Sequence, residues 1–543
     1  MRSVTLLVAV LAVSAGATIG AVDASPTDSA NGTRADARAE PTITAAYPDP
    51  IADGDAGEFV VLDVPAGVDT TGYNLTDGDA TVALSNVTER GRVALSDAPA
   101  RARNVTDLPV VAVDSFSLAN GGEHLRLRRN DTVVDRAVYR DTEEGHLAVW
   151  NGTRIRWEPV GATDRPVVRA TGGQVRAFVL PDAPQVPIET LREADERILL
   201  AGYTLTSERI VDALVDAHER NVTIRVLLEG APVGGRTHRG ADSLDRLAAA
   251  GIEVRLIGGP HARYDYHHAK YAVVDDRALV LTENWKAAGT GGASSRGWGV
   301  RTNQTAVVDG LAATFRADAG GRDAIPWERF RRGRSFESGE VSTGNYSTNA
   351  RPSTVPVNST TLLVTPDNAQ RRLVETLDRA NDSIDVIQVT VGYENDLAAA
   401  LRRAARRGVE VRLLLSSAWY VREDNRALAE RFREWASAND APLSVKLADP
   451  RGRYGKIHAK GAVIDDRRVV LGSLNWNEAA ATSNREVLLL LHGHEVADYY
   501  GRVFDADWQG GRSPLPYGLL AAVAGCLGLA VIVGRKIRFE RSS

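Results

Sequence analysis

The chain has 543 residues and a formal net charge of −5, and 43% of its residues are hydrophobic and 25% charged. This length suits several domains, and the composition excludes a disordered or collagen-like protein. A single cysteine excludes an internal disulfide and any zinc or iron–sulfur site built from several cysteines. The slight excess of acidic over basic residues argues against a protein whose whole surface binds polyanions. It is compatible with local basic clefts. Lysine is scarce, because only six of the 65 basic residues are lysines.

The beginning of the chain is predicted to be an export signal and a spacer. Arg2 precedes an apolar run that extends to Ile19, and small residues follow it. This pattern is typical of a secretory signal peptide over residues 1–24, with an uncleaved anchor as the alternative. Residues 25–41 are rich in Asp, Ala and Ser without any period, and we expect a flexible linker there. Repeated Asn-x-Ser/Thr triplets, which are glycosylation acceptors in exported proteins, also favour export.

Residues 42–160 are predicted to form an all-β sandwich. Short apolar alternations such as Phe59–Leu62 and His124–Leu127 are separated by turn sequences rich in Asp, Asn and Gly. Several short strands at this spacing are typical of an immunoglobulin-like sandwich. The stretch from Tyr47 to Gly122 resembles the lamin-tail domain. That resemblance implies an attachment or targeting module without catalysis.

An internal repeat decides the fold class of the remaining chain. We place its copies at residues 175–335 and 361–510, joined by a linker over residues 336–360 that is rich in Ser, Thr, Asn and Gly. In each copy, runs of Val, Ile and Leu alternate with amphipathic helical segments, a pattern typical of parallel strands buried between helices. The matching runs are Phe178–Asp182 with Leu363–Asp367, Ile198–Tyr203 with Ile384–Val389, and Asn221–Leu228 with Gly408–Leu415.

Each copy carries a His-x-Lys tripeptide, then four residues, then an Asp. A single match of this kind can arise by chance, but two at matching places in a repeat indicate a shared chemical role. In an extended segment, His and Lys two residues apart lie on one face and reach one ligand. The motif residues are His268, Lys270 and Asp275 in the first copy, and His458, Lys460 and Asp465 in the second.

Further polar residues follow each motif, and the copies differ there. Hydroxyl and amide groups are neutral donors for phosphate oxygens, and lysine supplies a compact positive charge. Copy one has Gly297 at the place where copy two has a glutamate, so the first copy lacks that carboxylate. The residues that we expect to bind phosphate or support the site are Thr282, Asn284, Ser473, Asn475 and Glu486.

The paired motifs resemble those of the phospholipase D superfamily, and the resemblance extends from Ala177 to Trp508. It implies that the two copies pack about a pseudo-two-fold axis around one shared site, so that the chain is a monomer with an internal pseudo-dimer. It also implies that this site needs no metal and no other cofactor. One histidine would attack phosphorus to form a phosphohistidine, and the other would give a proton to the leaving group.

The resemblance also implies individual roles. We expect His268 to be the nucleophile and His458 the acid. The reverse assignment stays open, because Gly297 leaves one imidazole without a carboxylate to orient it. Glu486 resembles the carboxylate that orients a catalytic imidazole. The motif residues Asp275 and Asp465 would mainly support the motif.

The end of the chain is predicted to anchor it. Residues 515–534 contain a long uncharged stretch, close to the roughly 20 residues that a transmembrane helix needs. Basic residues in the tail, 535–543, follow at once and place it in the cytoplasm. The sequence thus predicts a single-pass protein of the cell membrane, with its catalytic part outside the cytoplasm and the membrane bound through this helix.

Together these features predict an α/β protein with two phospholipase D-like repeats, in which mixed or parallel sheets are flanked by helices. An immunoglobulin-like sandwich precedes the repeats, and one transmembrane helix follows them. The expected activity is hydrolysis or headgroup transfer on phospholipids at the outer membrane face. A nuclease of the same superfamily, acting on a nucleic-acid phosphodiester, is one alternative. The other is an inactive binding or scaffold protein of the cell envelope.

Overall fold

The computed structural model describes residues 40–510, with the exception of residues 52–55, 115, 153, 260–261 and 340. The described chain has three parts, which are a β region and two α/β repeats.

The predicted membrane architecture requires a correction. No helix in the described ranges is long and apolar enough to cross a membrane. The longest of these, α9 (Arg422–Ala438), has 17 residues and carries charges along its length, whereas a span needs about 20 mostly apolar residues. The prediction of a transmembrane helix in the fold is therefore wrong for the described residues, and the predicted single-pass localisation in the cell membrane is not supported. The segments 1–24, 515–534 and 535–543 lie outside the described residues.

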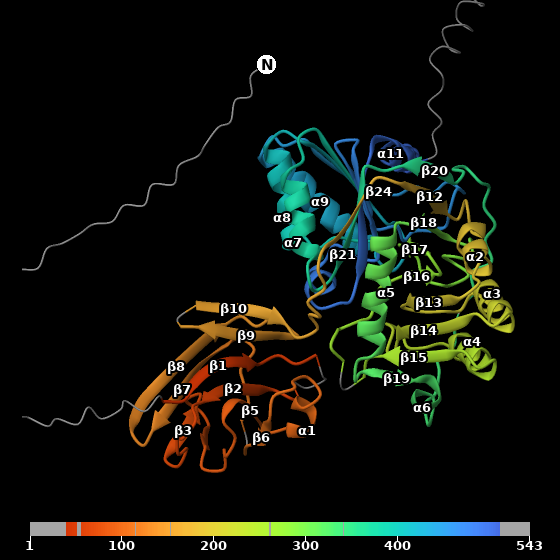
Figure 1. Ribbon diagram of the computed structural model, residues 1–543. Coiled ribbons are helices and arrows are strands. Elements are labelled where there is room, and N and C mark those ends of the chain that lie inside the picture. The colour runs from red at the N-terminus through yellow and green to blue at the C-terminus, as the bar shows by residue number, and fades with distance from the viewer. Residues whose placement is uncertain are drawn as a thin grey trace, which may run out of the picture. The chain divides into compact units, whose positions relative to one another are not determined.

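The β region consists of two facing sheets with an apolar core between them, and all of its described strand pairs are antiparallel except β5 with β6. One sheet has the order β10-β9-β1-β2-β5-β6, and the other has the order β4-β3-β7-β8. Alternate side chains of both sheets, such as Leu62 and Leu127, are fully buried in one cluster. The elements, red to orange in Figure 1, are β1 (Thr42–Tyr47), β2 (Phe59–Val64), β3 (Tyr73–Thr76), β4 (Thr81–Ala83), β5 (Gly91–Ser96), α1 (Pro99–Ala102), β6 (Val110–Ala112), β7 (Gly122–Arg129), β8 (Thr132–Arg140), β9 (His146–Asn151) and β10 (Arg154–Pro159).

The first repeat builds a sheet of order β19-β15-β14-β13-β16-β17-β18-β12-β20, to which β25 adds beside β18. Strands β13, β14 and β15 are parallel, because α3 and α4 return the chain between them. The elements are β11 (Val168–Thr171), β12 (Gln174–Leu180), α2 (Gln185–Arg192), β13 (Arg197–Gly202), α3 (Glu208–Glu219), β14 (Thr223–Glu229), α4 (His238–Ala249), β15 (Glu253–Ile257), β16 (Tyr271–Val274), β17 (Arg277–Leu281), β18 (Ser295–Thr302), α5 (Thr305–Ala319), β19 (Ala324–Pro326) and α6 (Trp327–Phe330).

The second repeat follows the same plan in a sheet of order β11-β21-β28-β27-β26-β22-β23-β24. Asn395 begins α8 by accepting a hydrogen bond from the backbone of Ala398, as a helix cap does. The elements are β20 (Ser353–Pro356), β21 (Ser359–Val364), α7 (Ala369–Asp378), β22 (Ser383–Gln388), α8 (Asp396–Arg406), β23 (Glu410–Leu415), α9, β24 (Leu443–Leu447), β25 (Lys456–Ile457), β26 (Gly461–Ile464), β27 (Arg468–Gly472), α10 (Glu478–Thr482), β28 (Val487–His492) and α11 (His494–Trp508).

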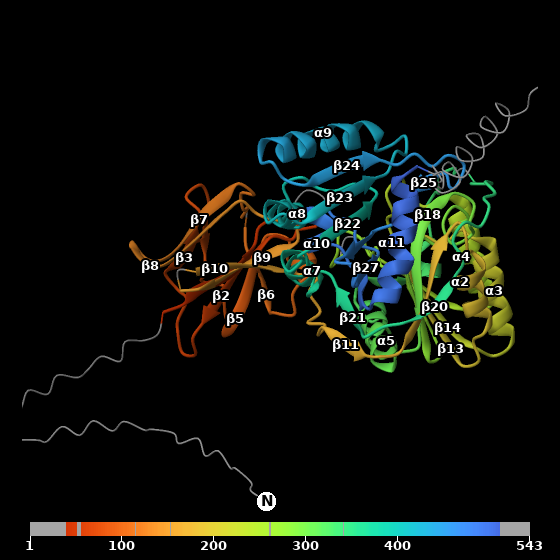
Figure 2. The same ribbon diagram turned by 90° about the horizontal axis from the view of Figure 1, so that it is seen from above.

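Helices cover both faces of each sheet. Helices α2, α3 and α4 lie on the outer face of the first sheet, and α7, α8 and α9 lie on the outer face of the second (Figure 1). Between the sheets lie α5 and α11, each of which contacts strands of both sheets (Figure 2). Apolar side chains of both repeats form one continuous buried cluster there. The repeats are therefore halves of one core.

The two repeats also exchange edge strands. Strand β11, which precedes the first repeat, pairs with β21 of the second sheet, whereas β20 pairs with β12 of the first sheet. The chain passes from β11 to β12 through Gly172 and Gly173, whose φ angles of 67° and 95° favour glycine. Part of the segment expected to be a linker, 336–360, is thus a strand of the first sheet.

Candidate active site

The fold places the two His-x-Lys tripeptides at the contact between the repeats. Each tripeptide directly precedes a central strand, β16 or β26, of its own sheet. The backbone N–H of His268 donates to the carbonyl of Arg485 at 2.9 Å, and that of His458 donates to Arg296 at 3.0 Å. Each motif is thus bonded to the opposite repeat, and both imidazoles lie at the shared interface.

His268 is held by a carboxylate of the second repeat. Its Nδ1 lies 2.8 Å from Oε1 and 3.1 Å from Oε2 of Glu486, which is fully buried. Burial would raise the pKa of Glu486, but His268 and Lys270 hold it below its ordinary value. The ionised carboxylate accepts the Nδ1–H, so the lone pair of His268 lies on Nε2. Burial also lowers the pKa of His268 to about 4, which keeps the imidazole neutral.

His458 is held by the first repeat through a residue that the sequence analysis missed. Its Nδ1 donates to the carbonyl of Thr282 at 3.1 Å and lies 3.3 Å from Oε2 of Glu283. Glu283 fills the space above Gly297, where a Cβ would lie 2.2 Å from Cγ of Glu283. The carboxylate absent at Gly297 is therefore supplied from the neighbouring strand end. Two features of the sequence could have indicated this role: the glutamate between Thr282 and Asn284, and the absence of a carboxylate at Gly297.

Both motif lysines are buried beside the histidines. Lys270 donates to the carbonyl of His268 at 2.5 Å, and Lys460 donates to that of His458 at 2.8 Å. Burial lowers the pKa of Lys460 to about 8 and that of Lys270 well below its ordinary value. Burial also raises the pKa of Glu283 to about 8. Burial thus destabilises the ammonium forms of both lysines, and a bound anion would stabilise these forms.

The four neutral donors fall into two kinds. The hydroxyl of Thr282 accepts a hydrogen bond from the backbone of Trp298 at 2.9 Å, and that of Ser473 accepts one from Val487 at 3.0 Å. These hydrogen bonds fix the backbone next to the two carboxylates, Glu283 and Glu486. The side-chain oxygens of Asn284 and Asn475, in contrast, are buried without a hydrogen-bond partner in the described part of the chain.

The motif aspartates lie away from the histidines. A whole strand, β16 or β26, separates each aspartate from its lysine. Asp275 accepts backbone hydrogen bonds from residues 195–197, and Asp465 does so from residues 381–383. Burial opposes ionisation, but these donors lower the pKa of both carboxyls. The aspartates therefore fix the start of the adjacent strand and lie away from the histidines.

Two buried arginines join the repeats, and the sequence analysis did not single them out. Arg485 pairs with Asp367 of its own repeat at 2.6 Å and with Asp318 of the other at 3.1 Å. Arg296 repeats this arrangement with Asp182 at 2.5 Å and Asp507 at 2.9 Å. All six side chains are almost completely buried. Because the carbonyls of these arginines receive the N–H groups of the histidines, the ion pairs position both motifs.

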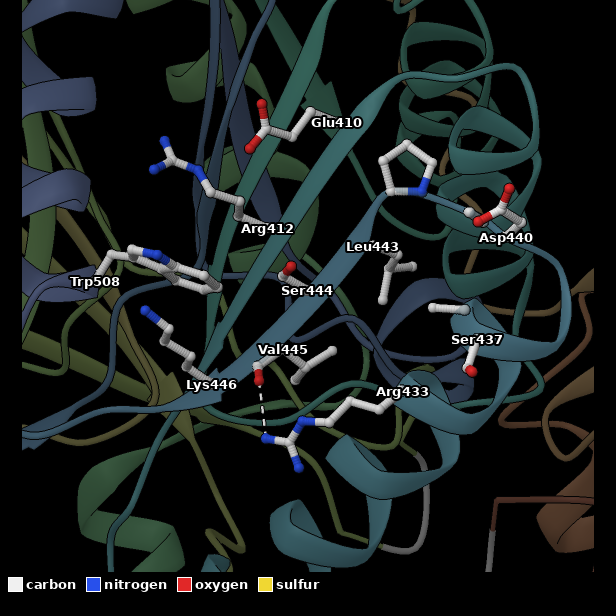
Figure 3. Close-up of a pocket in the computed structure, with 13 residues that line it drawn as sticks. Glu410, Arg412, Arg433, Ser437, Asp440, Leu443, Ser444, Val445, Lys446 and Trp508 are labelled. Carbon is white, nitrogen blue, oxygen red and sulfur yellow. Dashed lines mark hydrogen bonds between the residues drawn. The ribbon is translucent and has the colours of Figure 1, made fainter.

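An open hollow lies elsewhere, along β23, β24 and α9 (Figure 3). Its volume is ≈ 880 Å³, and no motif residue lines it. Arg412 in its wall is paired with Asp385 at 2.6 Å, and Lys446 Nζ lies 4.3 Å above the ring of Trp508. These cations are already partnered, so we assign the hollow no part in the chemistry.

Comparison with protein families identifies the two repeats. The family described as cardiolipin synthase, PLD-like domain, matches residues 188–319 and 373–508. These matches and the curated relatives support PLD-like domains of the cardiolipin synthase and phospholipase D superfamily in both repeats. Each matched range contains one His-x-Lys tripeptide, so the match covers both halves of the shared site.

Curated proteins similar to this chain are enzymes of the same superfamily. Mitochondrial cardiolipin hydrolase of Xenopus tropicalis is 30% identical over 26% of this chain and 62% of its own length. Phospholipase D of Rickettsia typhi is 27% identical over 26% of this chain and 64% of its length. Cardiolipin synthase B of Salmonella typhimurium is 24% identical over 56% of this chain and 72% of its length.

The chain thus spans less than two thirds of the length of the first two relatives. The names of the relatives support the enzyme class predicted from the sequence, a phosphodiesterase of the phospholipase D superfamily. The PLD-like repeats therefore confirm the predicted family at the level of the superfamily.

Proposed function

We propose that this chain is a phosphodiesterase that hydrolyses or exchanges the headgroup ester of phospholipids through a phosphohistidine intermediate. The observation that carries the proposal is the pair of imidazoles, one buried and one partly buried, each bonded to the opposite repeat. Displacement at phosphorus needs a nucleophile, a proton donor and positive charge around the non-bridging oxygens. The two histidines and the two lysines offer all three within one chain, so we propose that it acts as a monomer.

In the first step, Nε2 of His268 attacks phosphorus and the bond from phosphorus to the leaving oxygen breaks. Glu486 favours this role for His268, because it accepts the Nδ1–H and leaves the lone pair on Nε2. His458, protonated at Nε2, gives that proton to the leaving alkoxide. Burial and then Lys460 lower the pKa of His458, and a bound anionic phosphodiester opposes both effects.

In the second step, neutral His458 removes a proton from water, and the water oxygen attacks phosphorus. The bond from phosphorus to Nε2 of His268 breaks, and the phosphoryl group leaves as a monoester. An alcohol in the place of water gives a new diester. Lys270, Lys460 and the amides of Asn284 and Asn475 stabilise the non-bridging oxygens throughout.

The substrate class rests on the relatives. The three described above are named for cardiolipin or for phospholipase activity, which favours a phospholipid over a nucleic acid. For residues 42–160 we propose a lamin-tail-like attachment module, supported by the two facing β sheets.

A direct substrate comparison tests the proposal. The full-length chain is incubated, with a chelator present, with phospholipid vesicles and separately with plasmid DNA. We expect headgroup release from the vesicles and intact DNA. Cleavage of DNA without lipid turnover would identify the nuclease alternative, and turnover of neither would favour the inactive scaffold. An absolute need for added divalent metal would contradict the phosphohistidine route.

Glu283 is proposed to position His458, and an exchange of residues between copies tests this. Copy two carries Leu474 and Glu486 where copy one carries Glu283 and Gly297. Glu283→Leu is expected to lower kcat roughly 10- to 100-fold with little change in KM, because the imidazole loses the group that orients it. The double variant Glu283→Leu/Gly297→Glu moves the carboxylate to its copy-two position and is expected to recover most of the loss.

The single variant Gly297→Glu is the matched control. Its side chain meets Glu283 in the same space, so it should be impaired when Glu283 is present and tolerated when Glu283 is leucine. Steady-state kinetics and thermal unfolding are measured on all four chains. Full activity of Glu283→Leu, or no recovery in a folded double variant, would refute the positioning role.

A further inference from the structure

The few lysines of this chain gather at the candidate site. Of the six lysines in the sequence, Lys446 lies in the hollow of Figure 3 and Lys536 lies outside the described residues. Two of the other four, Lys270 and Lys460, belong to the motifs. The mechanism uses neither Lys286 nor Lys456, so their presence in a chain that otherwise prefers arginine needs an explanation.

Lys286 and Lys456 come from opposite repeats and meet on one flank of the site. Lys456 is the first residue of β25, two residues before His458, and it pairs in register with Ser295 of β18. Lys286 lies in the turn that leads to the same strand, and its carbonyl accepts hydrogen bonds from the backbone of Gly289 and Gly291. Gly289 lies close to Glu283, the partner of His458, because a Cβ at Gly289 would lie 2.6 Å from Oε2 of Glu283. Both lysines therefore border the His458 side of the site.

Neither ammonium has an anionic partner in the part of the chain that the structure describes. No carboxylate there lies within 4.0 Å of Nζ of Lys286 or Lys456, and Nζ of Lys456 lies 5.0 Å from the centre of the Tyr420 ring. Both side chains are only partly buried. Arg236 and Lys456 add to the burial that lowers the pKa of Lys286. Glu283 offers little compensation, because burial raises its pKa to about 8.

The opposite flank has no such charge. The repeat relates Lys456 to Tyr266 and Lys286 to Asn477. The ring of Tyr266 packs edge-on against Tyr203 at 5.9 Å, and the side chain of Asn477 caps α10 by accepting from Ala480 at 2.9 Å. One flank of the site thus carries two lysines that no carboxylate of the described chain pairs with, whereas the other flank is neutral and occupied by internal contacts.

We propose that Lys286 and Lys456 form a second phosphate subsite, which binds a further phosphate group of the same lipid substrate while the motif lysines hold the scissile one. The subsite deepens the proposed function and rests on it. Compact ammonium groups suit a phosphate oxygen at short range, and a second anion there neutralises a cationic flank that nothing else in the described chain neutralises. The preferred substrate is then a phospholipid with two phosphates, bound in one orientation.

The test compares lipids with one and two phosphates at equal surface charge. Phosphatidylcholine vesicles carry either cardiolipin or twice as much phosphatidylglycerol. The full-length chain, the double variant Lys286→Gln/Lys456→Gln and the control Lys446→Gln are assayed on both. We expect the double variant to lose at least about 10-fold in kcat/KM on cardiolipin and less than about 2-fold on phosphatidylglycerol. The control should match the unchanged chain on both vesicles.

An equal loss on both lipids, or no loss, would overturn the subsite, because general attraction to an anionic surface does not distinguish the vesicles. Sedimentation of the same chains with the same vesicles gives a binding readout that is independent of turnover. If the unchanged chain turns over neither lipid, the proposed function fails, and the binding difference still decides the subsite. Weaker binding of the double variant to single-stranded DNA with unchanged lipid binding would also overturn the lipid subsite.

Discussion

Replacing His268 by glutamine is expected to lower turnover by at least about 10³-fold, because the substitution removes the proposed nucleophile and no other group bonded to Glu486 can attack phosphorus. The effect should fall on kcat, since the lysines and amides that bind phosphate remain. Replacing His458 by glutamine should also abolish steady-state turnover of a lipid, because the alkoxide then leaves without a proton. Steady-state rates alone therefore do not distinguish the two histidines.

A phosphodiester with a nitrophenyl leaving group separates the roles, because nitrophenolate departs without a proton. With His458→Gln we expect a burst of nitrophenol equal to the enzyme concentration, followed by a stall at the phosphohistidine. With His268→Gln we expect no burst. Acid-labile phosphate on the trapped protein provides a second measurement. A burst in His268→Gln and none in His458→Gln would reverse the assignment, and a burst in neither would contradict a covalent intermediate.

Replacing Arg485 by methionine is expected to lower the free energy of unfolding by about 3–5 kcal/mol, the usual loss when one partner of a buried ion pair is removed. Asp318 and Asp367 would remain buried with no cation between them. Urea unfolding of the full-length chain measures the change. Because the variant can fail to fold, Arg485→Lys is measured as well, and we expect it to retain part of the stability.

An exposed pair gives the matched control. Arg403 and Asp378 lie 2.9 Å apart with exposed side chains, so Arg403→Gln should change the unfolding free energy by less than about 1 kcal/mol. A loss below about 1 kcal/mol for Arg485→Met as well would contradict the structural role of the buried pair.

The sequence was sufficient for those features that repeat in it. The matching apolar runs predicted strands between helices, and the superfamily resemblance implied one shared site with Glu486 as the carboxylate that orients an imidazole. Which imidazole Glu486 holds was not predicted, and the structure places it on His268. A carboxylate for His458 was not predictable in the same way. Which acidic side chain fills the space over Gly297 depends on the packing of β17 against β18, and spacing along the chain carries no such information.

The other features that were not predicted depend on contacts between residues that lie far apart in the sequence. The structural role of Arg485 and Arg296 was not predictable from the sequence. Their partners Asp318 and Asp507 lie on helices of the opposite repeat, far away along the chain. The strand inside the expected linker was missed because its partner, β12, lies far back in the chain. Polar composition predicted solvent there, whereas Val355 is buried against the first sheet.

The exchange of edge strands links the two halves of the chain, because each sheet includes a strand from outside its own repeat. Residues that precede the first repeat complete the second sheet, and residues that precede the second repeat complete the first. Neither half has its whole sheet within one uninterrupted stretch of sequence, so each half alone would lack an edge strand. Synthesis must reach β21 before β11 finds its neighbour, and the two motif histidines come together only when both halves of the polypeptide are present.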